Sequence, residues 1–242
     1  MNIVLVGRQK EKLNELSSTI EFWYRVRTIV IEADHILENE EAYEEIKTKL
    51  WALDIGILIN NVGMSSPHPE YFLDLPHRTR IYSQIIRNNI LSVTNMTMLL
   101  LPRMVERNRG VIVNVASTAA IIPSPLLTVY GASKAYIVKF SRDLACEYAN
   151  HGIIIQCIMP GFIAINKSEI DRPSLISPTP DEYVAQAVRT IGILQQTTGY
   201  FPHSLMVGII HFFQYFTPSW IDWMILRNME NIRCRAIQKY VG

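Results

Sequence analysis

Tyr130 and Lys134 have the spacing that places two side chains on one face of a helix. A lysine ammonium beside a phenol favours the phenolate and lowers the pKa of the tyrosine from about 10. A tyrosine tuned in this way donates a proton to a carbonyl oxygen in a reduction, or accepts one in an oxidation. Such a pair is common on protein surfaces, and here it gains weight from its context. Ser117 directly follows an apolar run, and the pair opens the next helix.

Five short apolar runs predict the strands that position these side chains. They are rich in β-branched residues and do not alternate strictly with polar ones, which is typical of parallel strands covered on both faces. The runs are residues 3–6, 26–31, 55–59, 111–116 and 153–159.

Helical patterns, with apolar residues on one face, lie between these runs. The patterns are Leu13, Leu16 and Ile20; Tyr43, Ile46, Leu50 and Leu53; and the longer stretches 78–107 and 129–150. Gly110 and Gly152 stand just past two of the helices, where a left-handed C-terminal cap favours glycine. The repeated alternation of strand and helix predicts an α/β fold with a doubly wound parallel sheet.

Ligands of such sheets bind beyond the carboxyl ends of the strands. The candidates for a site are therefore the residues that follow the apolar runs. They are Gly7 and Arg8, Asp34, residues 60–63, Ser117, and Pro160 with Gly161.

The composition excludes several classes of protein. Of the 242 residues, 49 % are hydrophobic and 19 % are charged, unlike a disordered, collagen-like or low-complexity chain. Lys and Arg number 23 and Asp and Glu number 22, so the net charge of +1 gives no electrostatic argument for nucleic acid. The three cysteines lack metal-ligand spacing and indicate free thiols in a reducing compartment, and we expect no metal.

Two apolar segments are candidates for contact with a membrane. Residues 1–6 are too few for the core of a signal peptide or for a membrane span. Residues 205–226 are rich in Ile, Phe, Trp and Met but contain His211, Pro218 and Asp222. This segment is open to three interpretations: a membrane span, an amphipathic helix at a membrane surface, or ordinary burial.

Residues 60–63 (Asn-Asn-Val-Gly), Asn89, Ser117, Tyr130 and Lys134 together resemble, in order and spacing, the signature of the short-chain dehydrogenase/reductase family. By itself, a mid-helix asparagine such as Asn89 is more often a solvent-facing residue. The resemblance implies that Tyr130 is the acid/base and that Ser117 hydrogen-bonds the substrate oxygen. It also implies that Lys134 holds the nicotinamide ribose and lowers the tyrosine pKa, and that Asn89 anchors a water in the proton relay.

Three further stretches, 57–64, 69–74 and 101–107, are similar to one branch of this family. The branch is the 17β-hydroxysteroid dehydrogenase type 12 group, the very-long-chain 3-oxoacyl-CoA reductases. It implies NADPH-dependent reduction of a small-molecule lipid, either a 3-oxoacyl-CoA or a ketosteroid. It also implies a place on the cytosolic face of the endoplasmic reticulum membrane, and it is compatible with a homodimer.

The family also suggests cofactor contacts. Arg8 is placed to pair with a 2′-phosphate, or is a solvated arginine that opens a helix. Asp34 resembles the family's adenine-contacting residue, or caps a helix. Asn60 and Gly63 allow close approach to the cofactor, or make a tight turn. Ile163 joins Tyr130 and Lys134 among the expected cofactor contacts.

The sequence departs from the family in two places. The family begins with a strand and a Gly-rich turn that cradles the pyrophosphate. This sequence has no such motif, and aligned by motif, Met1 falls at the family's second strand. We therefore expect a sheet without its central first strand, so that its halves separate or the strands near Ile3 and Ile55 meet. In addition, Ile165 stands where the family often has a threonine.

These departures leave two hypotheses about function. The chain is a reductase that lacks its beginning, or a non-catalytic member with a binding role or with no retained role. Retention of Ser117, Tyr130 and Lys134 favours the first, whereas the missing cradle predicts weak NADPH binding by the 242 residues. We expect residues 1–200 to form the Rossmann-like domain and residues 201–242 an apolar helical extension of it. Without an N-terminal anchor, the expected location is the cytoplasm.

Overall fold

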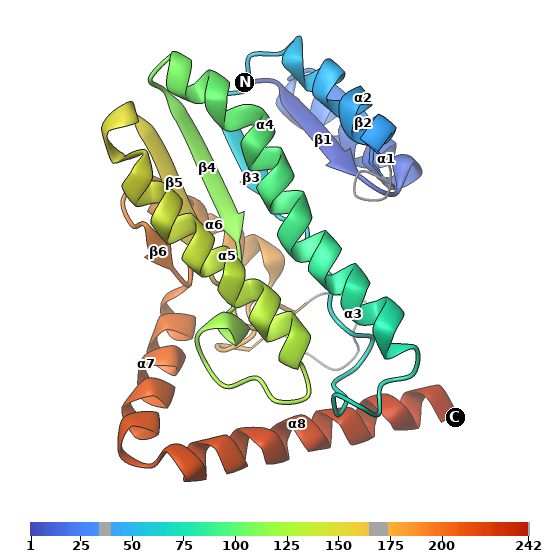
Figure 1. Ribbon diagram of the computed structural model, residues 1–242, viewed down its shortest axis with the longest axis vertical. Coiled ribbons are helices and arrows are strands. Elements are labelled where there is room, and N and C mark those ends of the chain that lie inside the picture. Colours follow the sequence, from blue (N-terminus) through green and yellow to red (C-terminus); the bar gives the residue numbers. More distant parts are fainter. Residues whose placement is uncertain (34–39, 165–173, 242) are drawn as a thin grey trace. The chain divides into compact units, whose positions relative to one another are not determined.

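The computed structural model describes residues 1–33, 40–164 and 174–241, and it divides the chain into two compact units (Figure 1). The first unit is Met1–Ile55 and the second is Gly56–Gly242. Both are built from parallel strands and helices in alternation, as the sequence predicts. The division into a domain at 1–200 and an extension at 201–242 stays a prediction.

The first unit contains two strands and two helices: β1 (Ile3–Gly7), α1 (Lys10–Tyr24), β2 (Thr28–Glu32) and α2 (Glu40–Trp51). The strands pair in parallel, with a register that runs from Ile3 beside Thr28 to Gly7 beside Glu32. Helix α1 ends at Arg25, which takes the left-handed conformation with φ 52° and donates its N–H to the carbonyl of Glu21. The predicted runs 3–6 and 26–31 are therefore confirmed as strands.

The second unit contains a four-stranded parallel sheet in the order β3-β4-β5-β6. Its strands are β3 (Ile57–Asn60), β4 (Gly110–Val115), β5 (Ile153–Ile158) and the short β6 (Gln196–Thr197). β3 pairs with β4 in a register that runs from Ile57 beside Val111 to Asn60 beside Asn114. The expectation that the halves of the sheet separate or that the strands near Ile3 and Ile55 meet stays a prediction.

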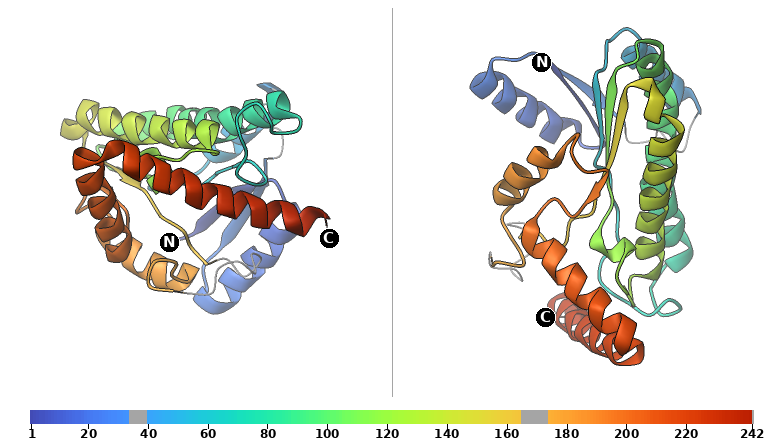
Figure 2. Two further views of the ribbon diagram at one scale, coloured as in Figure 1. Left: turned by 90° about the horizontal axis from the view of Figure 1, so that it is seen from below. Right: turned by 90° about the vertical axis from the view of Figure 1, so that its left-hand side faces the viewer.

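Helices lie on both faces of this sheet and bury most of β4 and β5, whereas Ile57 and Ile59 of β3 stay exposed. The elements are α3 (Arg78–Ile86), a π-helical turn η1 (Arg87–Leu91), α4 (Ser92–Glu106), α5 (Thr128–Glu147) and α6 (Pro180–Ala187), with 3₁₀ turns η2 (Thr118–Ala120), η3 (Ala149–His151) and η4 (Val188–Thr190). Figure 2 shows α4 and α5 on one face and α6 on the other. Ile112, Ile137 and Met104 are fully buried between them, and each such side chain contributes about 1.5–3 kcal/mol.

One of the two predicted glycine caps is wrong. Gly152 has φ 65° and follows η3 in the left-handed conformation, as expected. Gly110, in contrast, begins β4, and Asn108, with φ 49°, takes the left-handed conformation after α4. Position 110 needs a glycine for space instead, because a Cβ there would lie 2.6 Å from the Met104 side chain.

The C-terminal apolar stretch forms two helices, α7 (Phe201–Phe216) and α8 (Pro218–Val241). They are separated at Thr217, because Pro218 fits the first turn of a helix and not its interior. No helix in the described parts of the chain has the length and apolarity to cross a membrane. Several large apolar side chains of α7 are exposed, including Leu205, Phe212 and Phe216.

The first turn of α7 carries His203, a buried side chain that holds two other segments in place. Its Nδ1 accepts a hydrogen bond from the N–H of Gly161 at 3.1 Å, and its Nε2 lies 3.0 Å from the carbonyl of Ile176. Both contacts are made when the ring is neutral and carries its proton on Nε2. Burial lowers the pKa of His203, and backbone hydrogen bonds at Ile176 and Phe162 offset only part of that effect.

We expect the free energy of unfolding to fall as the pH is lowered through about 6.5, where an unfolded histidine takes up a proton. Folded His203 resists that proton because its pKa is lowered, so acid favours the unfolded chain. Urea unfolding of wild type and His203→Phe at pH 7 and pH 5.5 measures the effect. The variant should be less stable at pH 7 by about 1–3 kcal/mol, since two backbone groups lose their partner. Its stability should change less with pH, and an equal pH dependence of the two proteins contradicts the prediction.

Candidate active site

Helix α5 places Tyr130 and Lys134 one turn apart on the same face, as the sequence predicts. The Lys134 ammonium lies 5.9 Å from the centroid of the Tyr130 ring. It donates a hydrogen bond of 2.9 Å to the carbonyl of Val115, the last residue of β4. Lys134 is only 3 % exposed, so its charge lies at the carboxyl end of the sheet and away from water.

Ser117 lies two residues beyond β4, next to the same face of α5. Its hydroxyl accepts the N–H of Ala119 at 3.2 Å and so caps the short turn η2. Its side chain is near enough to Tyr130 to lower the pKa of the phenol. The structure therefore brings Ser117, Tyr130 and Lys134 together, whereas in the sequence 13 positions separate Ser117 from Tyr130.

The pKa values in this group differ from the expectation. Burial raises the pKa of Tyr130, and the Ser117 side chain lowers it by less. Burial also lowers the pKa of Lys134 to about 8. The sequence predicts a phenol whose pKa is lowered by the lysine, whereas removal from water is the largest effect on Tyr130 here and raises its pKa. Tyr130 therefore keeps its proton at neutral pH.

Asn89 lies in the π-helical turn η1 and is fully buried. Its Nδ2 donates to Ser133 Oγ at 2.8 Å and to the Met64 carbonyl at 2.9 Å. Its Oδ1 accepts the Met64 N–H at 2.7 Å. Asn89 thus faces α5 from the neighbouring helix and joins it to the loop after β3, unlike a solvent-facing residue. Its expected role of anchoring a water stays a prediction.

Asn60 takes part in a buried network that crosses the sheet. Its Nδ2 donates to Asn114 Oδ1 at 2.8 Å, and Asn114 Nδ2 donates to Ser141 Oγ at 2.9 Å. The amide of Asn60 therefore bonds within the protein, and a contact with a cofactor stays a prediction. The sequence interpretation missed Asn114 and Ser141. The polar Asn114 inside the run Val111-Ile112-Val113-Asn114-Val115 is the signal that could have found the network.

The other predicted cofactor residues lie in different settings. Gly63 approaches Lys134 so closely that a Cβ at position 63 would lie 3.2 Å from the ammonium. Ile163 is partly buried and packs against the cluster formed by Val113, Ile158, Tyr183 and Ala187. Arg8 is exposed at the end of β1 in the first unit. Asp34 and Ile165 lie outside the described residues.

Comparison with known proteins gives consistent matches. A family model described as short chain dehydrogenase matches residues 1–172. A very-long-chain 3-oxoacyl-CoA reductase of Homo sapiens is 43 % identical over 240 residues, which are 99 % of this chain and 75 % of that protein. The reductase of the same name from Anas platyrhynchos is 42 % identical over 239 residues, with the same coverage.

Solved structures agree with these matches. The structure of a 7β-hydroxysteroid dehydrogenase has a TM-score of 0.78 and 26 % identity, and the match covers 95 % of this chain and 87 % of that one. A short-chain dehydrogenase from Sphingobium yanoikuyae in complex with NADPH has a TM-score of 0.68 and 27 % identity, with 78 % and 74 % covered.

A Rossmann-like fold with a serine, a tyrosine and a lysine at one end of the sheet defines a class of oxidoreductase. The chain belongs to the short-chain dehydrogenase family. Within that family it falls in the branch of the very-long-chain 3-oxoacyl-CoA reductases, as the sequence resemblance indicates.

The buried charge of Lys134 predicts a distinctive stability profile. The pKa of Lys134 is about 8 in the folded chain and 10.5 in the unfolded chain. Below pH 8 the folded chain therefore bears the full free-energy cost of burying the charge. That cost disappears as the pH rises from about 8 towards 10.5. We therefore expect wild type to gain stability relative to Lys134→Met between pH 7.5 and pH 9.5. Parallel urea unfolding curves at the two pH values measure the difference, and a constant difference contradicts the assigned pKa.

Proposed function

We propose that the chain is an NADPH-dependent reductase that converts the 3-oxo group of a lipid acyl-CoA to a hydroxyl group. The observation that carries the proposal is the position of the Lys134 ammonium, 5.9 Å from the centroid of the Tyr130 ring, at the end of the sheet where Ser117 follows β4. The names of the relatives support an acyl-CoA substrate.

The chemistry follows from the three side chains. NADPH, when bound, supplies a hydride to the carbonyl carbon. Tyr130 donates its proton to the carbonyl oxygen, and its raised pKa suits a donor because the phenol is protonated at neutral pH. Ser117 hydrogen-bonds the same oxygen as negative charge develops on it. The carbonyl becomes an alcohol, and Tyr130 regains a proton from water.

Lys134 suits the role of holding the nicotinamide ribose. An ammonium has three N–H donors, and its hydrogen bond to the Val115 carbonyl uses one of them. The ammonium lies beside Gly63, where a Cβ would come within 3.2 Å of it. Hydrogen bonds to ribose hydroxyls would compensate for the charge that the folded chain keeps away from water.

Tyr130→Phe tests the proton donor. The variant keeps the ring and its packing but has no hydroxyl, so we expect turnover to fall by about 10²-fold or more, with NADPH affinity nearly unchanged. Steady-state reduction of a long-chain 3-oxoacyl-CoA and of an oestrone-like steroid gives the rates, because the resemblance admits both substrates. Ser117→Ala should lower turnover mainly, and Lys134→Ala should lower turnover and cofactor affinity. Full turnover by Tyr130→Phe on either substrate rules out this role.

The cofactor is tested separately. The sequence lacks the Gly-rich turn, so we expect weak NADPH binding by the 242-residue chain, with NADPH preferred over NADH. Arg8→Ala should reduce that preference, because a guanidinium contact with the 2′-phosphate is lost. Titration by nucleotide fluorescence measures both affinities. An unchanged preference removes Arg8 from the site, and micromolar binding by wild type means that other groups replace the turn. No turnover at saturating NADPH favours the non-catalytic alternative.

We further propose that the chain associates with the surface of the endoplasmic reticulum membrane. The exposed apolar face of α7, which includes Phe201, Leu205 and Phe212, supports this placement. The exposed Trp220 and Trp223 of α8 add side chains that favour a membrane interface.

A further inference from the structure

The ring of His203, in the first turn of α7, fits closely against the loop that follows β5. Its Nδ1 accepts the N–H of Gly161 at 3.1 Å. A Cβ at position 161 would lie 2.9 Å from the ring, so the close approach of loop and ring requires a glycine there. The rings of Tyr200 and Tyr183 pack around His203, with centroids 5.0 and 6.0 Å from that of the imidazole. The histidine is fully buried, and its packing fixes the ring that binds Gly161.

The loop after β5 continues this connection to the candidate active site. Pro160 directly precedes Gly161, and its carbonyl accepts the N–H of Thr118 at 2.9 Å. Thr118 begins the turn η2, which the hydroxyl of Ser117 caps. Pro160 and Ser117 both follow the carboxyl ends of strands, where ligands of a parallel sheet bind. A path of two hydrogen bonds therefore joins the His203 ring to the turn that follows Ser117.

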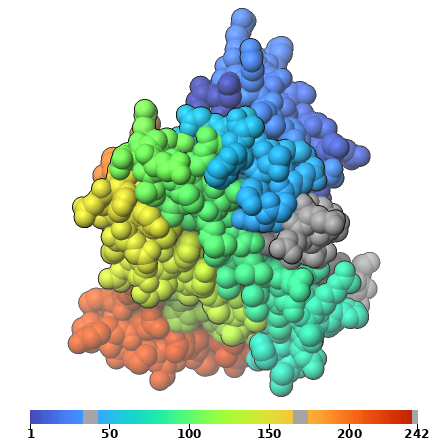
Figure 3. All heavy atoms as spheres, turned by 45° about the horizontal axis from the view of Figure 1, so that its top comes forward, coloured from blue at the N-terminus to red at the C-terminus, as the bar shows by residue number. Residues whose placement is uncertain are grey.

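Helix α7 also contacts the other end of this turn. Its His211 Nε2 lies 2.7 Å from the carbonyl of Ile121, the residue that follows η2. In the space-filling view, the C-terminal helices (orange to red) lie against the yellow-green part of the chain, to which η2 and α5 belong (Figure 3). One helix is thus connected to both ends of η2.

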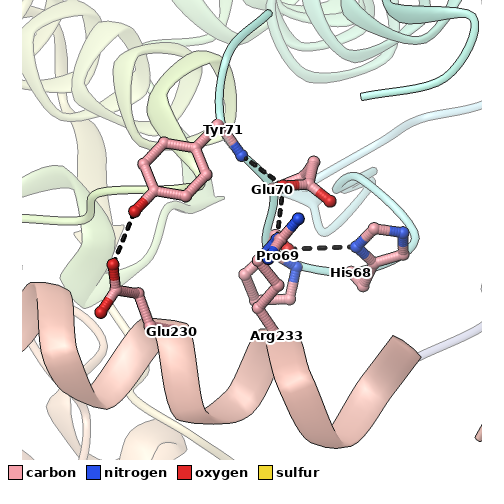
Figure 4. Close-up of polar contacts among 6 residues, drawn as sticks. All are labelled: His68, Pro69, Glu70, Tyr71, Glu230 and Arg233. Carbon is pink, nitrogen blue, oxygen red and sulfur yellow. Dashed lines mark hydrogen bonds and ion pairs between the residues drawn. The ribbon is translucent and has the colours of Figure 1, made fainter. Parts of the chain in front are cut away.

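Helix α8 makes a separate contact with the loop between β3 and α3 (Figure 4). Arg233 donates its Nε–H to the buried Glu70 carboxylate. The N–H of Glu70 in turn donates to the carbonyl of Leu126, which precedes α5. These bonds share no residue with the path from His203, so a substitution of His203 leaves them in place.

We propose that His203 is a positioning residue of the candidate active site: through Gly161 and Pro160 it holds the turn η2, and so keeps the Ser117 hydroxyl where it meets the substrate oxygen. The inference rests on the proposed function for the role of Ser117. A misplacement of about 1 Å can lower the rate of a reaction by about 10²-fold, so a residue that only fixes a backbone turn can affect turnover. His203 acts through the turn and does not itself need to touch the substrate.

The two nitrogens of the ring allow the connection to be separated from simple packing. Nδ1 accepts the N–H of Gly161, whereas Nε2 bonds the carbonyl of Ile176. In an asparagine, the side-chain oxygen lies near the position of Nδ1 and can accept from Gly161. In a glutamine, the longer side chain brings its NH₂ group near the position of Nε2, where it can donate to Ile176. His203→Asn thus keeps the bond that leads to Ser117 and loses the other, and His203→Gln does the reverse.

The test compares these variants and His203→Phe in the NADPH-dependent reduction of a long-chain 3-oxoacyl-CoA by the full chain. We expect His203→Gln and His203→Phe to lower kcat by about tenfold with KM within about twofold of wild type, because an interaction made in the transition state is weakened. His203→Asn should keep kcat within about threefold of wild type. All three variants should unfold at a lower urea concentration than wild type, since each loses a buried hydrogen bond. Equal kcat values in His203→Asn and His203→Gln overturn the proposal.

A Ser117→Ala background shows whether His203 acts through Ser117. In that background, His203→Gln should lower kcat by less than about twofold further, because the hydroxyl that it positions is gone. A further tenfold fall means that His203 acts elsewhere, and it overturns the proposal.

Tyr183→Phe is the matched control for stability. Tyr183 packs on the His203 ring, and its hydroxyl donates to the Thr198 carbonyl at 2.9 Å. The variant loses this buried hydrogen bond but keeps the path to Ser117. It should unfold at a lower urea concentration, with kcat within about twofold of wild type. If its kcat falls as much as that of His203→Gln, the role of His203 is only structural and the proposal is wrong.

The two proposals fail separately. No turnover by wild type contradicts the proposed function. Hydrogen exchange still tests the path in that case, because Gly161 and Thr118 each donate an N–H to it. Faster exchange of both amides in His203→Gln than in His203→Asn and Tyr183→Phe supports the path, and equal exchange in the three variants overturns it.

Discussion

The burial of the Lys134 ammonium is the constraint on which the candidate site depends. A charge that is 3 % exposed is costly to keep, and one hydrogen bond to the Val115 carbonyl compensates for only part of that cost. This cost lowers the pKa of Lys134 to about 8 in the folded chain. A pKa shifted this far by burial is frequent at functional sites.

The polar networks around this charge give the site its rigidity. Asn89 uses both groups of its amide to join the loop at Met64 to Ser133 on α5. The π-helical turn that carries Asn89 sets it between two regular helices, α3 and α4. Such turns are frequent at functional sites because they displace one side chain without ending the helix. Asn60 and Asn114 add a second network that ties β3 to β4 and α5.

Helix α8 is connected to the residues near Tyr130, although it lies far from them in the sequence. Arg233 lies 163 positions from Glu70 in the sequence, yet their contact reaches the residues that precede Tyr130.

The sequence by itself determines the order of strands and helices, because apolar periodicity and β-branched runs are local properties. It also places Tyr130 and Lys134 on one face, since helical geometry fixes neighbours four residues apart. Only the tertiary structure decides the rest. The partners of Asn60, Asn89 and Glu70 come from distant segments, and the left-handed residue after α4 is Asn108 and not Gly110. The pKa of Tyr130 is raised and not lowered, because the balance between desolvation and charge depends on how many atoms surround the phenol, and that number is set by packing.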